Sequence, residues 1–166
     1  MKMTLTGMGA LASLLIGMSG DALADTNTYG AYQCEPLNLA HPFSRGVAFG
    51  IGNPSTTVAA TYICPLVRDN LPALLPLASV QVVVQDFTTS GAISCTFTSR
   101  SLTGGQLGTS TRVTSSPGVG VQTLPAFAAL PTSSTGFTTL HCTVPRRATA
   151  VGQGTSRVIS YRATEV

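Results

Sequence analysis

The sequence predicts an all-β protein, an antiparallel β-sandwich of about seven strands held by two disulfides and preceded by a cleaved signal peptide. Three observations support this. The first residues form an export signal, and helix-forming patterns are nearly absent after it. β-Branched residues, Gly, Pro, Ser and Thr then recur at short intervals, as in chains of many short strands. Finally, an even number of cysteines remains in an exported chain, namely Cys34, Cys64, Cys95 and Cys142.

Residues 1–24 have the pattern of a secretory signal peptide. Lys2 supplies positive charge, an apolar run covers residues 8–18, and Ala22 and Ala24 are the small residues of a cleavage site. Cleavage near Ala24 leaves residues 25–166 as a single β-sandwich domain. The apolar run is shorter than the roughly 20 residues that a membrane helix requires. We therefore expect a secreted or periplasmic protein with no membrane span in the mature chain.

Three segments in the first two-thirds of the chain alternate as half-buried strands do. The first, residues 56–66, ends near Pro65. The second and third, residues 79–87 and 92–99, are separated by a short polar turn and are predicted to form a hairpin. The predicted inward residues are Val58, Ala60, Tyr62 and Cys64 in the first segment, Val80, Val82 and Val84 in the second, and Ile93, Cys95 and Phe97 in the third. In the third segment, Ser94, Thr96 and Thr98 are predicted to face water.

The adjacent His141 and Cys142 invite a functional interpretation, but they lie in another alternating segment, residues 137–144. Neighbouring residues of a strand point to opposite faces, so Cys142 is predicted to point inward, with Leu140 and Val144 on the same face, and His141 toward solvent. The final strand, residues 157–165, is predicted to place its core residues opposite its polar ones. The predicted core residues are Ile159, Tyr161 and Ala163, and the residues opposite are Ser160 and Arg162.

Four cysteines allow three pairings, and the strand pattern favours Cys34 with Cys64 and Cys95 with Cys142. Cys95 and Cys142 each have apolar residues two positions away on both sides, as two halves of a buried cross-link would. Each bridge closes a loop of about 30 to 48 residues and contributes about 4 kcal/mol in the chain-entropy treatment. We expect the bridges to join the two β layers and to leave no thiol to react.

The connections are less clearly patterned. The segment from Ser99 to Gly120 is rich in Ser, Thr and Gly and allows two interpretations, a long loop or exposed strands. The apolar segment 68–78 contains Pro72 and Pro76, which interrupt a helix, so it is predicted to be a loop. Tyr62 and Tyr161 are predicted to lie in the core. Tyr29 and Tyr32 are predicted to be exposed.

Residues that perform catalysis are scarce. His41 and His141 are the only candidate imidazole bases, and no Gly-x-Ser-x-Gly elbow follows the signal peptide. No His-x-x-x-His, Cys-x-x-Cys or Asp-rich calcium loop occurs, so neither a metal nor another cofactor is predicted. The sequence therefore favours a protein that is not an enzyme.

Charge is low, at 9% of the 166 residues with a formal net charge of +3, and the longest basic cluster is Arg146 with Arg147. This cluster is too short to follow a nucleic acid, which is not predicted as a partner. Joined in space by Arg157 or Arg162, the pair could bind a phosphate or an acidic polysaccharide. The alternative is a solvated strand end that serves solubility.

Five runs carry a resemblance to known proteins: YICPL at 62–66, VQVVVQD at 80–86, ISCTF at 93–97, LHCTVP at 140–145 and ISYRATE at 159–165. Together they resemble small uncharacterised exported two-disulfide β-sandwich proteins of Gram-negative bacteria. More loosely, the chain is similar to the fimbrial subunits exported through a chaperone and an usher. The resemblance implies a β-sandwich that is located outside the cytoplasm.

The sequence thus predicts a non-catalytic secreted or periplasmic protein that acts by surface contact, in adhesion, assembly or ligand binding. The expected partner is a protein or an envelope or extracellular polysaccharide. Self-association through sheet edges is also expected, because a low-charge β surface protects its edges poorly. Two alternatives are an inhibitor or binder of a secreted hydrolase that presents the Ser99 to Gly120 segment, and a small hydrolase that uses His41 or His141.

Overall fold

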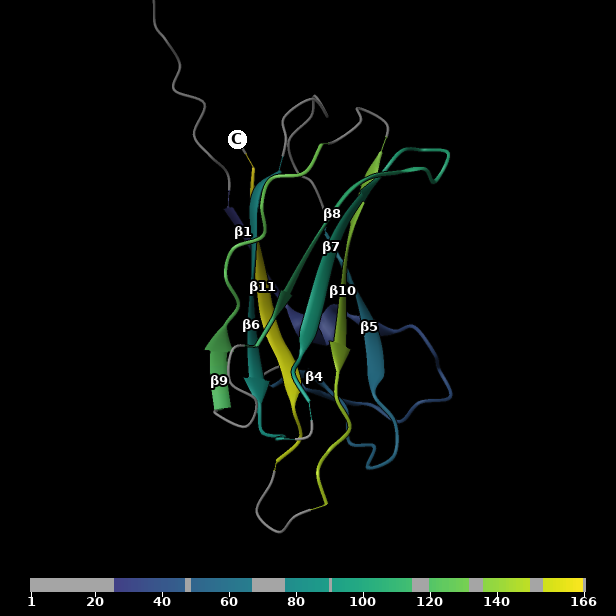
Figure 1. Cartoon of the computed structure of the whole chain (residues 1–166), viewed down its shortest axis with the longest axis vertical. Coiled ribbons are helices and arrows are strands. Elements are labelled where there is room, and N and C mark those ends of the chain that lie inside the picture. Colours follow the sequence, from purple (N-terminus) through teal and green to yellow (C-terminus); the bar gives the residue numbers. More distant parts are fainter. Residues whose placement is uncertain are drawn as a thin grey trace, which may run out of the picture.

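The computed structural model of the chain forms two antiparallel sheets that enclose one core, which confirms the predicted all-β sandwich (Figure 1). The structure describes residues 26–46, 49–66, 77–89, 91–114, 120–131, 136–149 and 154–165, so the predicted signal peptide lies outside it. The described residues contain eleven strands rather than about seven. The additional strands are two to five residues long, too short for alternation to reveal them. Within these ranges, no helix has the length and apolar character needed to cross a membrane.

The first sheet is built around β11, with the strand order β3-β4-β11-β6-β9. β6 pairs along nearly the whole of one edge of β11, whereas β4 and β1 share its other edge. The strands of this sheet are β1 (Thr26–Gly30), β3 (Ser44–Gly46), β4 (Gly50–Gly52), β6 (Leu77–Asp86), β9 (Gly120–Thr123) and β11 (Arg157–Glu165).

The second sheet has the strand order β2-β5-β10-β7-β8. Its strands are β2 (Glu35–Pro36), β5 (Ala60–Pro65), β7 (Ser94–Arg100), β8 (Gln106–Val113) and β10 (Phe137–Val144). β8 decides between the two interpretations of the Ser99 to Gly120 segment, because residues 106–113 are an exposed strand at the edge of this sheet. A tight turn leads into it, closed by a 2.8 Å bond from the Ser101 N–H to the Gly105 carbonyl.

The hairpin predicted for residues 79–87 and 92–99 is wrong. β6 lies in the first sheet and β7 in the second, so the chain crosses between the layers after Asp86. The physical reason is that β11 and β9 already pair with the two edges of β6, which leaves no edge for β7. β7 instead pairs with β10 and β8.

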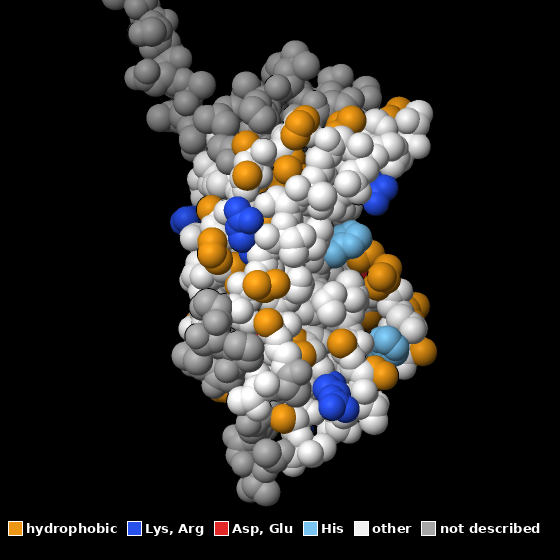
Figure 2. Space-filling view, in the orientation of Figure 1, with side chains coloured by type: hydrophobic (Ala, Val, Ile, Leu, Met, Phe, Trp, Pro, Cys, Tyr) orange, Lys and Arg blue, Asp and Glu red, His pale blue; other side chains and the backbone are white. Residues whose placement is uncertain are grey.

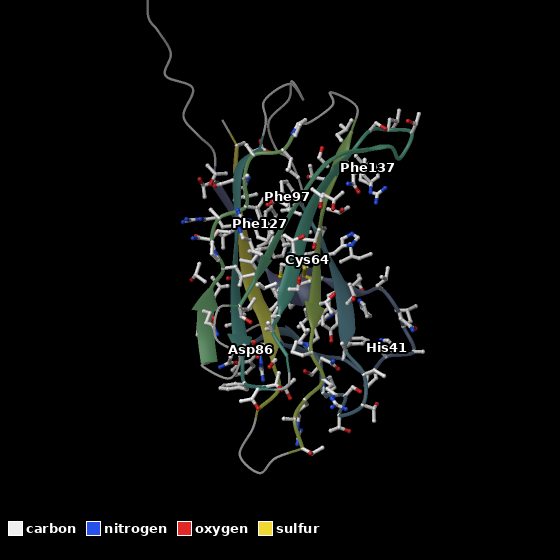
Figure 3. All side chains as sticks on the ribbon, in the orientation of Figure 1. His41, Cys64, Asp86, Phe97, Phe127 and Phe137 are labelled. Atoms are coloured by element: carbon white, nitrogen blue, oxygen red, sulfur yellow. A yellow bond between two sulfur atoms is a disulfide. The ribbon has the colours of Figure 1, made fainter. Side chains whose placement is uncertain are left out.

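The core lies between the sheets and largely follows the predicted alternation. Phe97 of the second sheet packs edge to face with Phe127, their ring centres 6.3 Å apart (Figure 3). Val58 is an exception and is 41% exposed, because β5 begins only at Ala60. The predicted inward residues that are buried are Ala60, Tyr62, Cys64, Val80, Val82, Val84, Ile93, Cys95, Phe97, Leu140, Cys142, Val144, Tyr161 and Ala163.

Ile159 was also predicted to face the core, and this is wrong because β11 contains a bulge. The register of β11 against β6 shifts between Val158, opposite Val84, and Ser160, opposite Val83. Ile159 is therefore the extra residue, and Val158 takes the buried position instead. Beyond the bulge the alternation resumes, so Tyr161 stays buried as predicted.

Both predicted disulfides, Cys34–Cys64 and Cys95–Cys142, are confirmed, but they do not join the layers. Cys95 lies directly opposite Cys142 on the neighbouring strands β7 and β10, and Cys34 immediately precedes β2, the neighbour of β5. Their Cα atoms are 4.1 and 4.0 Å apart. Facing sheets pack about 10 Å apart, too far for a disulfide between regular strands. The bridges therefore brace the second sheet internally.

The layers are joined instead by two buried tyrosines that each donate to a backbone carbonyl across the core. The Tyr62 hydroxyl donates to Gly52 of the first sheet at 2.9 Å, and the Tyr161 hydroxyl donates to Pro65 of the second at 2.6 Å. Burial raises the pKa of both hydroxyls, and Tyr29 adds to the rise in the pKa of Tyr161. Tyr29 is half-buried rather than exposed, because its ring stacks on Tyr161 at 5.1 Å.

Candidate functional site

Threonines gather on the outer face of the second sheet. The strands that send apolar residues inward send mostly hydroxyl-bearing residues outward, and cross-strand pairing places these side by side. Thr143, for example, lies opposite Thr61 on one side and Ser94 on the other. We call this surface the hydroxyl face and define it by Thr61, Ser94, Thr96, Thr98, Thr109, Thr111, Thr139 and Thr143.

The hydroxyl groups of this face are regularly spaced. Neighbouring strands lie roughly 5 Å apart, and residues on one face of a strand recur roughly every 7 Å. Thr61 and Thr143 share a hydrogen bond of 3.0 Å between their hydroxyls, as do Thr96 and Thr111. Thr98 points to the same face but is only 7% exposed, so the prediction that it faces water is wrong. Thr139 and Thr109 flank it on the neighbouring strands.

His141 lies within the hydroxyl face, as predicted from its outward position. It is half-buried between Ile63 and Thr96 on the adjacent strands. Burial, and secondarily the positive charge of Arg100, lower the pKa of His141 from its ordinary value of 6.5. The imidazole is therefore neutral at pH 7, and the centre of the face carries no charge.

The lowered pKa of His141 predicts how stability depends on pH. As the pH falls through 6.5, the ordinary value, the unfolded chain takes up the proton before the folded chain does. The contribution of His141 to the free energy of unfolding should therefore be constant above that pH and decrease below it. Urea denaturation of the wild type and His141→Gln at a series of pH values measures this. The wild type should lose stability relative to the variant only on the acid side, and a constant difference would contradict the assignment.

The structure does not bring Arg157 together with the other three arginines of the predicted patch. Arg157 lines a groove of about 300 Å³, and the second arginine in that groove is Arg45. The Arg157 guanidinium lies 5.6 Å from the centre of the Phe49 ring, and Arg45 lies 3.1 Å from the Glu35 carboxylate. Sequence reasoning missed Arg45, because only the pairing of β3 with β4 and of β4 with β11 brings it near Arg157.

The other three predicted arginines lie elsewhere among the described residues. Arg162 donates to Gln81 at 3.0 Å on the outer side of the first sheet, about 16 Å along β11 from Arg157 at the usual rise per residue. Arg146 and Arg147 are exposed beyond the end of β10, where the Arg147 N–H donates to Ser55 at 2.7 Å. None of these three lines the groove that holds Arg157. Figure 2 likewise shows basic side chains as isolated spots on a mostly uncharged surface.

The two histidines lie in different settings. His41 is in a loop, where its Nε2 is 3.2 Å from the Asn38 side-chain nitrogen, whereas His141 lies on β10. Within the described ranges, neither histidine is hydrogen-bonded to a carboxylate. No group of three or more His, Cys, Asp or Glu side chains is placed to hold a metal ion in this part of the chain.

Asp86 is a buried carboxylate that the sequence reasoning did not single out. It is fully buried and accepts 3.0 Å bonds from the hydroxyls of Ser156 and Thr114 and a 3.2 Å bond from the Thr88 N–H. These bonds tie the end of β6 to the segments after β8 and before β11. Both carboxylate oxygens have partners within the protein, which is the arrangement of a structural centre. Continuing the alternation of β6 by two residues beyond Val84 would have placed Asp86 inside.

Comparison with known proteins adds no functional assignment. No protein-family model, no curated protein and no solved structure matches this chain. The resemblance to exported two-disulfide proteins therefore stays a prediction. The hydroxyl face and the groove with Arg45 and Arg157 are the two surfaces on which we base a function.

Proposed function

We propose that this protein is a non-catalytic, exported β-sandwich that binds a neutral polysaccharide of the envelope or the extracellular medium through the hydroxyl face. The observation that supports this most is the cross-strand register, which places eight Thr and Ser side chains on one side of one sheet, all but the buried Thr98 and the buried Thr139 hydroxyl within reach of a ligand. A broad face of this kind suits a ligand that is itself extended. A hydroxyl-rich polymer offers matching donors and acceptors.

The chemistry of threonine fits such a ligand. Its hydroxyl both donates and accepts hydrogen bonds, as sugar hydroxyls do, and its methyl group can contact the C–H groups of a sugar ring. Threonine has restricted side-chain freedom, so little conformational entropy is lost on binding. Because His141 is neutral at pH 7, the ligand would not have to displace water from a buried charge.

Export is supported by the state of the cysteines. All four are bridged, so none is free. Structural disulfides form and persist in oxidising compartments such as the periplasm and the extracellular medium. The N-terminal export signal in the sequence leads to the same location.

Charge placed on the hydroxyl face should weaken polysaccharide binding. Thr96→Lys and Thr143→Lys each put a cation among the hydroxyls, and we expect the affinity for the bound polysaccharide to fall at least about tenfold. The measurement is cosedimentation of the mature protein with insoluble cellulose, chitin and β-glucan. Thr28→Lys is the matched control, because Thr28 is exposed on the other sheet, opposite Arg162. The proposal fails if the wild type binds none of these polymers, or if all three variants bind alike.

A second candidate ligand is an acidic polysaccharide bound at the groove. The observation in its favour is that Arg157 and Arg45 both line the groove and each lies over a phenylalanine ring, with Phe49 itself 62% exposed. A uronate could place its carboxylate on Arg157 and its ring on Phe49. Including polygalacturonate in the same assay distinguishes the two, because Arg157→Gln would then weaken binding and Thr96→Lys would not.

A further inference from the structure

We propose that two copies of this protein associate through β8, which pairs antiparallel with β8 of the second copy about a twofold axis at Ser110. The two five-stranded sheets would become one continuous sheet. This inference goes beyond the proposed function, because it does not depend on any ligand.

The outer edge of β8 is open to such pairing. β8 is eight residues long and pairs with β7 along one edge only, with regular pairing from Gly108 to Val113 and a register shift at Leu107. Among the described residues, no backbone hydrogen bond crosses its other edge. Residues 106–113 contain no Lys, Asp, Glu or Pro, which are the residues that commonly protect an edge strand. An edge of this length and composition is a template for another strand.

The hydrogen bonds at the end of β8 show which residues face the open edge. The Thr114 N–H donates to the Ile93 carbonyl at 3.0 Å, and the Thr114 hydroxyl accepts from the Ile93 N–H at 3.1 Å. The main chain of residue 114 therefore faces the β7 side. Since these directions alternate along a strand, the N–H and C=O groups of Thr109, Thr111 and Val113 face the open edge.

Two copies of β8 are complementary in one register. Residues directly opposite each other in an antiparallel pair share a face, so an outward residue must meet an outward residue. With Ser110 on the axis, Thr109 of each copy lies opposite Thr111 of the other copy. Leu107 is the extra residue at the register shift and directly precedes the regular stretch. The same register brings it, 41% exposed, near Val113 of the second copy, 51% exposed, at the end of that stretch. Registers centred on Thr109 or Thr111 leave one of these apolar residues unmatched.

The inner face and the charges allow this register. Arg112 would lie opposite Gly108 of the second copy, where Leu130 and Pro131 of that copy already fill the space beside the glycine. The guanidinium is already directed into its own subunit, 5.9 Å from the Phe127 ring centre and bonded to the Ala126 carbonyl at 3.3 Å. The two Arg112 residues would be offset by four positions, about 13 Å along the strands. That exceeds the Debye length of about 8 Å at physiological ionic strength, so their repulsion is weak.

Pairing through β8 would also extend the hydroxyl face. Thr109 and Thr111 form its outermost column, so the columns of the two copies would meet at the axis. A dimer would then present two hydroxyl faces side by side to one polymer. Two linked binding surfaces raise the overall affinity without any new type of contact.

Sedimentation of the full mature protein over a range of concentrations tests the pairing. We expect a monomer–dimer equilibrium, with the dimer dissociation constant raised at least tenfold in Thr109→Pro. Proline at this position removes an N–H on the open edge and leaves the bonds to β7 in place. Thr109→Val is the matched control, because it keeps the N–H and the branched side chain, and it should dimerise as the wild type does. Leu107→Lys, which places a charge on the edge, is a second variant that keeps the test valid if Thr109→Pro does not fold.

A cross-link tests the register itself. Ser110→Cys places two thiols opposite each other at the axis, as Cys95 lies opposite Cys142 within the sheet. We expect a disulfide-linked dimer on non-reducing gels, whereas Arg112→Cys should give little. A wild type that stays monomeric at its highest soluble concentration would overturn the inference, and so would a Thr109→Pro variant that dimerises normally. Polysaccharide cosedimentation of Leu107→Lys, which keeps every residue of the hydroxyl face, shows separately whether the proposed function holds.

Discussion

Replacing Asp86 with alanine is expected to lower the free energy of unfolding by about 4 kcal/mol. Asp86 is fully buried, and its removal leaves two buried hydroxyl donors, those of Ser156 and Thr114, without their acceptor, whereas the Thr88 N–H keeps a 3.2 Å bond to the Ser156 hydroxyl. Each buried group left without a partner costs about 1 to 3 kcal/mol. The loss is large because these groups hold the point where the chain crosses between the sheets. Urea denaturation followed by far-UV circular dichroism measures it.

The control for this prediction is Asp86→Asn, which keeps the shape and one acceptor oxygen. Its amide nitrogen would face the Thr114 hydroxyl, which now donates to the carboxylate and also accepts from the Ile93 N–H. One bond has to reorganise rather than three, so a loss of about 1 to 2 kcal/mol is expected. If alanine and asparagine destabilised the protein equally, or if neither had an effect, Asp86 would not organise this end of the sandwich.

Removal of either disulfide is the second large effect. The bridges span sequence separations of 30 and 47 residues. For such loops the chain-entropy treatment predicts a loss of about 4 kcal/mol each, with the two bridges differing by only about 0.4 kcal/mol. We therefore expect Cys34→Ala/Cys64→Ala and Cys95→Ala/Cys142→Ala to be destabilised to similar extents. Denaturation of each double variant, with both remaining cysteines confirmed as bridged by intact mass, gives the two values.

If the two double variants lost clearly unequal amounts of stability, one disulfide would contribute to the free energy of unfolding by more than chain entropy. Cys95 and Cys142 lie in the middle of the second sheet, on adjacent central strands, whereas Cys34 lies before the two-residue edge strand β2. If Cys95→Ala/Cys142→Ala were much the more destabilised, lost packing at the centre of the core would outweigh the entropy of the unfolded chain. A loss below about 1 kcal/mol for both variants would contradict the bracing role of the bridges.

The candidate surfaces differ in how far they can be predicted from the sequence. The alternation around Cys95 and Cys142 already places Thr96 and Thr143 outward, so the individual threonines of the hydroxyl face are predictable. Their arrangement is not, because it depends on which strands are neighbours and in which register. The arginine groove is less predictable still. Arg45 and Arg157 are more than a hundred residues apart in the sequence and lie in one groove because β4 lies between β3 and β11.

Local pattern alone was sufficient for the fold class, for the inward residues of β5, β6, β7 and β10, and for the pairing of the cysteines. These depend on the two-residue period of a strand and on the small number of ways to pair four thiols. The tertiary structure decided that β6 and β7 belong to different sheets, that a bulge at Ile159 moves Val158 into the core, and that both disulfides lie within one sheet. The separation of β6 and β7 depends on which strand edges are already occupied. Which edges are occupied is set by residues distant in the chain, so the alternation within a single strand does not reveal it.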